Sequence, residues 1–275
     1  GIFAALGVDK IRLTGGEPTV HPELVSIVSG LSHTPGIQSV TMTTNGVLLQ
    51  ELAEPLKAAG LQRVNISLDS NDPDEFNRIA RRDAHEKVWK GILAAEKAGL
   101  TPVKLNAVIV RGHNDETLLD MAAMTLDHPW YIRFIEMMPF GGATEFQLHQ
   151  VVTSHEVMER IESEFGKLIP ENDGKLDGEA MVFKIPNSLG TLGFISSVTA
   201  PFCSLCTRTR LTSDGKLRLC LLREDEVDLL TPLRAGATDE DLRRLIVDNI
   251  WVKPWGHGLA DGEVPVNRTM SEIGG

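Results

Sequence analysis

The chain has 275 residues, 42% of them hydrophobic, and a formal net charge of −11 at pH 7. Its apolar content supports a large core, but no apolar run approaches the ~20 residues that a membrane-spanning helix needs. The acidic balance argues against non-specific binding to nucleic acid or to a membrane surface, because both favour basic faces. Three closely spaced cysteines fit a reducing compartment, so we expect a cytoplasmic protein.

Residues 1–142 alternate short apolar strands with helical patterns. The expected strands are Lys10–Thr14, Ser39–Thr43, Arg63–Asp69, Pro102–Val110 and Tyr131–Met137. The expected helices lie near 22–33, 47–59, 73–80, 85–98 and 115–127, the last with Asn114 or Asp115 as its N-cap. Repeated strand–helix units imply right-handed crossovers and a parallel sheet. We therefore expect an α/β fold of the partial TIM-barrel type. Because the chain opens at Gly1 in what resembles the end of a helix, we expect an N-terminal strand to be missing.

Several of these strands have one polar and one apolar face, since side chains two apart share a face. The polar sets are Arg12 with Thr14, Asn65 with Ser67 and Asp69, and Lys104 with Asn106, joined by Arg133 or Glu136. Closed barrels usually fill their interior with Val, Ile and Leu. If the apolar faces meet the helices, the polar faces line a cavity. A solvent-facing antiparallel sheet would give the same alternation, but helices at every crossover favour the cavity.

Three loops follow strand ends, where barrel enzymes place their sites. In Thr14–Pro18, two glycines allow backbone to approach a ligand, and Glu17 could bind an ammonium group. Thr43–Gly46 offers hydroxyls and amides to a ribose or phosphate, and Met137–Gly142 is apolar enough to cover an adenine. Taken alone, these loops are also consistent with a tight turn, a helix cap and ordinary core.

Residues 143–275 are expected to complete the barrel and to add an α+β extension. The predicted elements are helices near 153–164 and 239–250 and strands at Ala180–Ile185 and Thr191–Val198. The polar segment 167–178 is predicted to be an exposed loop. The tail, 262–275, shows little helical pattern, and such tails are usually mobile.

The most informative segment is FCSLCTRTRLTSDGKLRLCL at 202–221, which holds all three cysteines. Cys203, Cys206 and Cys220 have the spacing C-x2-C-x13-C, and an Asp-Gly pair between two alternating runs predicts a hairpin. Pairing of the two arms would bring the third cysteine back towards the first two. Arg208 and Arg210 share one face of the first arm, and paired guanidiniums suit phosphate oxygens.

Three thiolates without a fourth cysteine suit an iron–sulfur cluster with one open iron, which could bind a substrate atom. A structural zinc site needs four ligands, and His257 is the nearest downstream candidate for the fourth. Cysteines that bind nothing are a third alternative, although reduced core cysteines usually scatter along a sequence. The spacing alone leaves these alternatives open.

Taken together, the motifs resemble the radical S-adenosylmethionine (SAM) family and, within it, the GTP 3′,8-cyclases of molybdenum-cofactor biosynthesis. The matching pieces are RLTGGEP at 12–18, TTNG at 43–46, the NISLD and VKLNAV strands, RFIEMMPF at 133–140, the cysteine segment and the terminal Gly-Gly. GGEP alone indicates only radical SAM. The cysteine triplet with its two arginines, together with the diglycine tail, indicates the cyclases. The resemblance covers nearly the whole chain.

The resemblance implies a role for each matching residue. The SAM contacts would be Gly15, Gly16, Glu17, Ser67 and Met138. The GTP contacts would be Arg12, Thr43, Lys104, Arg208 and Arg210. The ligands of a [4Fe–4S] cluster, whose open iron binds guanine, would be Cys203, Cys206 and Cys220. The catalytic set would be Arg208, Arg210 and the terminal Gly274 and Gly275, whose lack of side chains suits a narrow channel.

The implied reaction begins when a 5′-deoxyadenosyl radical, formed from SAM at a second, N-terminal [4Fe–4S] cluster, takes the 3′ hydrogen of GTP. The C3′ radical then closes onto C8 of guanine, a lyase reaction. GTP is the implied substrate, a homodimer is possible, and cyclic pyranopterin monophosphate synthase acts downstream. Radical SAM enzymes hold the N-terminal cluster in a C-x3-C-x2-C loop. All cysteines here follow residue 200, so the chain as it stands is expected to be inactive.

Two other functions fit parts of the sequence. A peptide-modifying radical SAM enzyme could carry an auxiliary cluster, although such enzymes usually have more C-terminal cysteines. A non-catalytic scaffold could hold zinc at the same three cysteines. Tight GTP binding would exclude the first, and a C-x3-C-x2-C motif in the coding sequence upstream of Gly1 would exclude the second.

Overall fold

A computed structural model describes residues 1–139, 149–261 and 264–273. Its main feature is a nine-stranded sheet in the order β1-β2-β3-β4-β5-β9-β8-β6, with β7 paired to β8. The parallel strands are β1 (Lys10–Leu13), β2 (Ser39–Thr44), β3 (Arg63–Ser67), β4 (Lys104–Ile109), β5 (Tyr131–Glu136) and β9 (Thr191–Ile195). The antiparallel strands are β6 (Ile169–Pro170), β7 (Leu176–Asp177) and β8 (Ala180–Lys184). The sheet does not close on itself, which confirms the predicted partial barrel.

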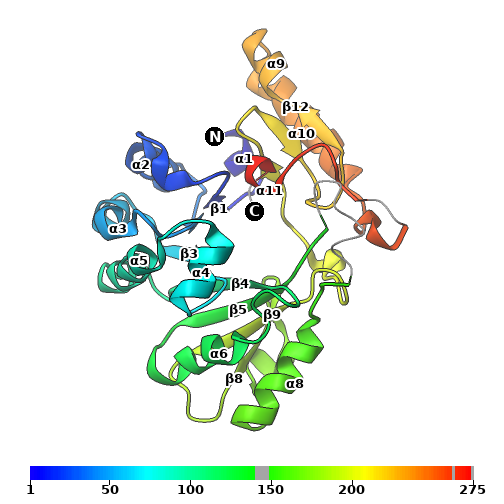
Figure 1. Cartoon of the computed structure of the whole chain (residues 1–275). Coiled ribbons are helices and arrows are strands. Elements are labelled where there is room, and N and C mark those ends of the chain that lie inside the picture. Colours follow the sequence, from blue (N-terminus) through cyan, green and yellow to red (C-terminus); the bar gives the residue numbers. More distant parts are fainter. Residues whose placement is uncertain (140–148, 262–263, 274–275) are drawn as a thin grey trace.

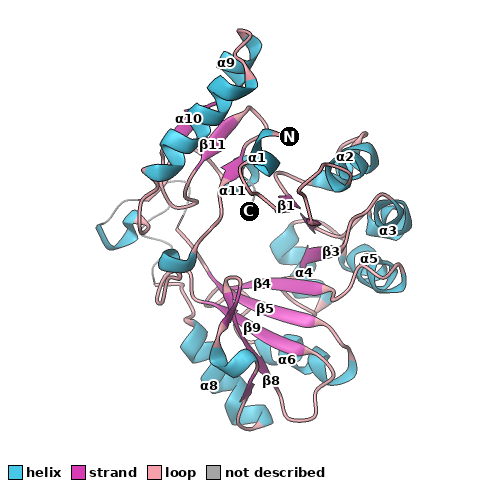
Figure 2. Ribbon diagram, turned by 180° about the vertical axis from the view of Figure 1, so that it is seen from behind, coloured by secondary structure: helices cyan, strands magenta, loops and turns pink. Residues whose placement is uncertain are grey.

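Helices follow the parallel strands, as the crossover pattern predicts. They are α2 (Leu24–Ser32), α3 (Leu49–Ala58), α4 (Pro73–Ala80), α5 (His85–Lys97), α6 (Leu118–Asp127) and α8 (Ser154–Phe165). In both views α2, α3, α5, α6 and α8 lie along one side of the curved sheet (Figures 1 and 2). Apolar strand residues such as Ile66, Leu105 and Phe134 are at most 1% exposed and belong to the same core as these helices. The polar strand faces therefore point away from the helices.

The approach of α5 to the rest of the barrel depends on two glycines. A Cβ added at Gly91 of α5 would lie 2.2 Å from the carbonyl oxygen of Gly46, in the loop after β2. Gly46 itself has φ +80°, a conformation that other residues rarely adopt. Because the backbones meet directly here, α5 packs closely against α3 and the end of β2.

The C-terminal extension has its own small sheet and core. Its strands are β10 (Arg210–Leu211), β11 (Lys216–Arg218) and β12 (Glu226–Asp228), and its helices are α9 (Leu230–Arg234) and α10 (Asp239–Trp251). The first helix, α1 (Ile2–Ala5), packs against this core through Ile2 and Phe3, beside Ile246. Both views place α9 and α10 at the opposite end of the molecule from α8 (Figures 1 and 2). The first helix of the chain therefore packs against the C-terminal extension and helps to hold it in place.

Several boundaries differ from the sequence predictions for identifiable reasons. The segment 167–178 is not a plain loop, since it contains β6, β7 and a 3-10 turn at Asn172–Gly174. Helix α6 begins after Thr117 and is not capped by Asn114 or Asp115. Asn114 is used elsewhere: it is 2% exposed, accepts from the Val110 amide at 2.8 Å and donates to the Asp69 carbonyl at 2.7 Å.

The tail also differs from its prediction. It contains a short helix, α11 (Met270–Ile273), which lies beside α1 in both views, and Ile273 is only 3% exposed. The predicted domain boundary at 142/143 falls outside the described residues. Among the described residues, no helix is both long enough and apolar enough to span a bilayer.

Candidate functional site

Cationic side chains from widely separated segments meet on the polar face of the sheet. We call them the cation cluster: Arg12 on β1, Arg63 on β3, Lys104 on β4, Arg133 on β5, and Arg208 and Arg210 in the cysteine segment. One carboxylate, Glu179, lies among three of them. Its oxygens are 3.0 Å from Arg133, 3.6 Å from Arg12 and 3.8 Å from Arg208, measured to the nearest guanidinium nitrogen. The predicted GTP contacts on β1 and in the cysteine segment therefore come together around one point.

Strand register explains why these residues meet. Thr43, Asn65, Lys104 and Tyr131 are successive partners across β2, β3, β4 and β5, so they form one row across the sheet. The next row towards the carboxyl ends contains Ser67, Asn106 and Arg133. Within it Arg133 Nε donates to Asn106 Oδ1 at 2.8 Å. Two predicted GTP contacts, Thr43 and Lys104, thus share a row, and the predicted SAM contact Ser67 lies one row beyond.

Burial and mutual repulsion shift the pKa values of the cation cluster. Burial lowers the pKa of Lys104 to about 8, helped by the charges of Arg133 and Arg63, although Asp177 Oδ2 lies 3.3 Å from its Nζ. Burial also lowers the pKa of Arg210 to about 10, with Arg208 as the next cause. Concentrated positive charge of this kind is costly without an anion, and it marks a functional site.

Buried polar atoms without hydrogen-bond partners surround Lys104. They are Nε of Arg63, both side-chain amide atoms of Asn65 and the hydroxyl of Tyr131. Asn65 is only 1% exposed and Tyr131 only 5%. Buried polar groups are normally paired, so unpaired ones in a single region indicate a place where a polar ligand binds. Since these atoms include donors and acceptors, they suit a sugar or a phosphate.

The cysteine segment forms the predicted hairpin, but it is shorter than expected. β10 and β11 pair Arg210 with Arg218 around the turn that contains Gly215, which has φ +76°. Cys203 begins a single 3-10 turn and Cys206 follows it, with the Cys206 amide donating to the Cys203 carbonyl at 3.1 Å. Both Cys206 and Cys220 act on the pKa of Arg210, so they lie near the cation cluster.

The donor set tests whether the cysteines fit a cluster. Burial raises the pKa of the Cys206 thiol, but hydrogen bonds and charge from Arg208 outweigh it and the net shift is downward. A lowered pKa favours the thiolate, which is the form that binds metal. The geometry is less complete: within the described ranges, no three His, Cys, Asp or Glu side chains are gathered as a metal site. The predicted convergence of all three thiolates is therefore not seen. His257, the alternative zinc ligand, does not complete such a group either.

Lys253 fastens the cysteine segment to the end of α10. Its ammonium donates to the carbonyl of Cys206 at 3.0 Å and to that of Arg208 at 2.7 Å. Its Nζ also lies 3.8 Å from the Cys206 sulfur. Lys253 was not predicted from the sequence, because nothing local links it to a segment 45 residues earlier.

The first glycine-containing loop is held by Glu17. One carboxylate oxygen accepts from the Thr19 amide at 3.0 Å and the Thr44 hydroxyl at 2.6 Å, and the other accepts from the Asn45 amide at 2.6 Å. Glu17 therefore joins the ends of β1 and β2. Gly15 has φ +134°, and the space around a Cβ at Gly16 is open, so a ligand could approach the backbone here.

The remaining predicted residues are less tightly placed. Ser67 is exposed at the end of β3, and Met138 is half-buried just after β5. The carboxyl ends of neighbouring parallel strands lie at one edge of a sheet, so both belong to the same edge as Gly16. Gly274 and Gly275 lie outside the described residues.

The structure also brings residues into the site that the sequence predictions did not include. Arg133 was named only as an alternative to Glu136, and Asp177 and Glu179 fell in or beside a predicted loop. Arg133 could have been found, because its parity matches Asn106 on the neighbouring strand. Glu136 has a different role, since it is 2% exposed and accepts from the amides of Ser154, Val198 and Thr199.

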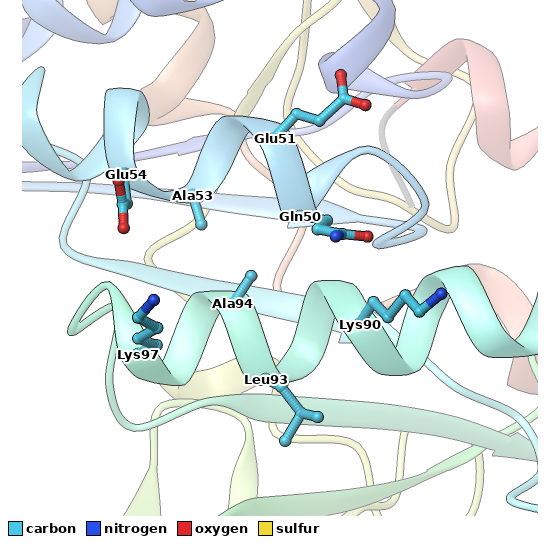
Figure 3. A pocket seen from close by; sticks show the side chains of 8 residues that line it. All are labelled: Gln50, Glu51, Ala53, Glu54, Lys90, Leu93, Ala94 and Lys97. Atoms are coloured by element: carbon cyan, nitrogen blue, oxygen red, sulfur yellow. The ribbon is translucent and has the colours of Figure 1, made fainter.

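A separate groove of about 380 Å³ lies on the outer surface between α3 and α5 (Figure 3). The close-up shows Glu51 and Glu54 on α3 and Lys90 and Lys97 on α5. These side chains are typical of a solvated helix face, and none belongs to the cation cluster. The groove is therefore not the candidate site.

Comparisons with known proteins identify the family of the chain. A family model of the radical SAM superfamily matches residues 2–125, and one described as Molybdenum Cofactor Synthesis C matches residues 130–259. A GTP 3′,8-cyclase from Gloeobacter violaceus is 47% identical over 100% of this chain and 85% of its own length. One from Peptoclostridium acidaminophilum is 46% identical over 98% of this chain and 81% of its own. Among solved structures, a radical SAM methyltransferase from Sphaerobacter thermophilus has a TM-score of 0.45 at 17% identity, covering 56% of this chain and 47% of that one.

The partial barrel, its polar inner face and the superfamily match together define a radical SAM protein. Identity over the full chain narrows this class further. The chain belongs to the GTP 3′,8-cyclase family.

Proposed function

We propose that this chain carries the GTP and SAM sites of a lyase that converts GTP to (8S)-3′,8-cyclo-7,8-dihydroguanosine 5′-triphosphate, the first step of molybdenum-cofactor biosynthesis. The observation that carries the proposal is the cation cluster beside buried polar atoms that lack partners. Among the described residues, the six cations have two carboxylates beside them, Glu179 and Asp177, and this excess of positive charge suits a polyanion such as a triphosphate. Relatives named GTP 3′,8-cyclase match over the full chain and support the same substrate.

The chain's own residues bind and orient the nucleotide. Arg12, Arg208 and Arg210 would hold phosphate oxygens, and Lys104 would add a charge from the middle of the sheet. The row that Thr43 and Asn65 share with Lys104 offers a hydroxyl and an amide to the ribose. Ring closure joins two atoms of one GTP molecule, so fixing the sugar and the base holds the conformer in which C3′ lies near C8, and burial keeps water away from a reactive radical.

Each cofactor has candidate residues of suitable chemistry, although the three thiolates are not gathered at one point in the described structure. Gly15, Gly16, Glu17, Ser67 and Met138 would form the SAM site at the carboxyl ends of the strands. Bound SAM supplies the 5′-deoxyadenosyl radical that removes the 3′ hydrogen of GTP. The ligands of an auxiliary [4Fe–4S] cluster would be Cys203, Cys206 and Cys220, since three thiolates suit iron and leave one position open. The match of residues 130–259 to a molybdenum-cofactor synthesis model supports a product that enters this pathway, in which cyclic pyranopterin monophosphate synthase would act next.

The test is nucleotide binding to protein reconstituted with iron and sulfide. We expect about four irons per chain, as one cubane cluster requires, and an EPR spectrum that changes with GTP and not with ATP. One zinc without sulfide would refute the cluster. Equal affinity for GTP and ATP would refute guanine recognition.

A further inference from the structure

Glu179 is a carboxylate that lies within the cation cluster. Its side chain is 12% exposed and has Arg12, Arg133 and Arg208 within 3.8 Å. Burial alone would raise the pKa of Glu179, but the attraction of these three guanidiniums outweighs it and lowers the pKa to about 2. Glu179 is therefore a permanent anion at the point where we place substrate phosphates.

Glu179 lies in the cation cluster because it belongs to a short turn between two neighbouring antiparallel strands. It is the second residue of the turn Gly178–Glu179 between β7 and β8, and Gly178 has φ +65°. β7 has two residues and pairs only through Leu176 and Asp177. Asp177, from the same turn region, lies against Lys104. The turn thus presents two carboxylates to the cations, whereas Ala180 and Val182 of the following strand are buried in a small core.

Of the three guanidiniums around Glu179, only that of Arg133 lies within hydrogen-bond distance. Arg133 donates one hydrogen bond at 3.0 Å, whereas the distances to Arg12 and Arg208 exceed hydrogen-bond length. A phosphate has more acceptor oxygens than a carboxylate and can bond several guanidiniums at once. An incoming polyphosphate therefore competes with Glu179 for the same donors and gains further contacts from Lys104 and Arg210.

We propose that Glu179 is a specificity-determining residue, an internal anion that occupies the phosphate site until a triphosphate displaces it. This inference rests on the proposed function, because it assumes that the cation cluster binds the phosphates of the substrate. A single phosphate would replace one carboxylate with little net gain. A triphosphate reaches cations that Glu179 does not touch, so affinity rises steeply with the number of phosphates.

The experiment compares phosphate, pyrophosphate and tripolyphosphate as ligands of the full chain by isothermal calorimetry. Removing a like charge a few ångströms from the ligand should tighten binding, so we expect Glu179→Gln to bind tripolyphosphate about tenfold more tightly than wild type. The gain for pyrophosphate should be larger than that for tripolyphosphate, so the variant discriminates less between chain lengths; an equal gain for both would show that Glu179 does not set specificity. Unchanged or weaker binding of both would overturn the inference.

Three controls make the result specific. Glu179→Asp keeps the charge and should retain the discrimination of the wild type. Glu54→Gln removes an exposed carboxylate on the outer face of α3 and should change nothing (Figure 3). If Glu179→Gln does not fold, as judged by circular dichroism, Asp177→Asn is the second variant. Asp177 is 51% exposed, and its replacement should tighten tripolyphosphate binding by about threefold; no change would count against the inference.

Nucleotide binding separates this inference from the proposed function. If wild type does not prefer GTP over ATP but Glu179→Gln still tightens tripolyphosphate, guanine recognition fails and the role of Glu179 stands. If wild type prefers GTP and Glu179→Gln has no effect on tripolyphosphate, the role of Glu179 fails and the proposed function stands.

Discussion

Lys104 and Tyr131 are direct partners in the parallel pair β4–β5, and the ammonium of Lys104 lies 4.3 Å from the centre of the Tyr131 ring. Gly193 on β9 makes room for this ring, since a Cβ there would lie 2.6 Å from it. The lysine is 5% exposed, and burial lowers its pKa to about 8. The face of the Tyr131 ring favours the charged form of Lys104, but it stabilises the ammonium less than a bound anion would. Lys104 therefore changes charge near physiological pH.

This pKa predicts that GTP affinity depends on pH. Below a pH of about 8 Lys104 is charged and attracts phosphate; above it the charge is lost, so affinity falls by up to about tenfold per pH unit. Lys104→Arg stays charged throughout, and its affinity should be flat between about pH 7.5 and 9.5. Calorimetry at several pH values measures both. Wild-type affinity that stays constant in this range would show that Lys104 does not contact the phosphates.

The stability effect of the same shift has the opposite sign. A lysine with a lowered pKa is less protonated in the folded protein than in the unfolded chain between about pH 8 and 10.5. The free energy of unfolding should therefore rise with pH in that window as far as Lys104 contributes. As pH rises and Lys104 loses its proton, GTP affinity therefore falls while the free energy of unfolding rises. This is expected of a site whose positive charges repel one another without a bound anion.

Arg208→Ala tests the cysteine segment. Charge-assisted hydrogen bonds contribute about 1.5–3 kcal/mol, so we expect GTP to bind at least about tenfold more weakly. Iron content should stay close to that of wild type, because Arg208 is not a metal ligand and acts on Cys206 only through its pKa. Arg243→Ala is the matched control, since that side chain is 52% exposed on α10. Equal GTP affinity in both variants would place Arg208 outside the phosphate site.

The barrel and half of the site follow from local sequence rules. Alternation in KIRLT and VKLNAV puts Arg12 and Lys104 on the polar face, and the strand–helix order fixes a parallel sheet. In a parallel sheet, the order and register of the strands alone decide which residues lie side by side on neighbouring strands. For this reason Thr43, Asn65 and Lys104 fall into one row, as the structure shows.

The other half of the site depends on long-range contacts that sequence patterns do not predict. Glu179 lies 167 residues after Arg12, and a polar, glycine-bearing segment is normally a loop. Lys253 bonds backbone carbonyls, which are the same for every residue type. Asn114 was expected to cap a helix, a common use of asparagine, but it bonds three backbone groups of the barrel. In each case the partner is set by tertiary packing.

Two helical glycines make a matched test of packing. Gly91→Ala should destabilise the protein by several kcal/mol, about 3 or more, because the new Cβ would lie 2.2 Å from the backbone oxygen of Gly46. Gly30→Ala on α2 meets nothing within 4 Å and should stabilise by about 0.5–1 kcal/mol, since alanine favours helix. Urea unfolding measures both. A Gly91→Ala protein as stable as wild type would contradict the close approach of α5.

Glu136→Gln tests the buried carboxylate that joins β5 to two later segments. It accepts from three backbone amides and from the Thr199 hydroxyl. The glutamine NH2 would face donors, so we expect a loss of about 2–4 kcal/mol in the free energy of unfolding. Exposed Glu164→Gln should change it by less than about 0.5 kcal/mol. Equal stability of the two variants would mean that these amides have other partners.

The cysteine content predicts which half of the chemistry the 275-residue chain performs. Its three cysteines all follow residue 200, and the C-x3-C-x2-C motif expected to hold the SAM-cleaving cluster does not occur in the sequence. After reconstitution we expect GTP binding without 5′-deoxyadenosine formation from SAM under reducing conditions. Chromatography measures the deoxyadenosine, and GTP binding in the same sample is the control for folding. Deoxyadenosine above the level of a protein-free blank would show that the Cys203, Cys206 and Cys220 site cleaves SAM itself, contrary to the auxiliary role proposed for it.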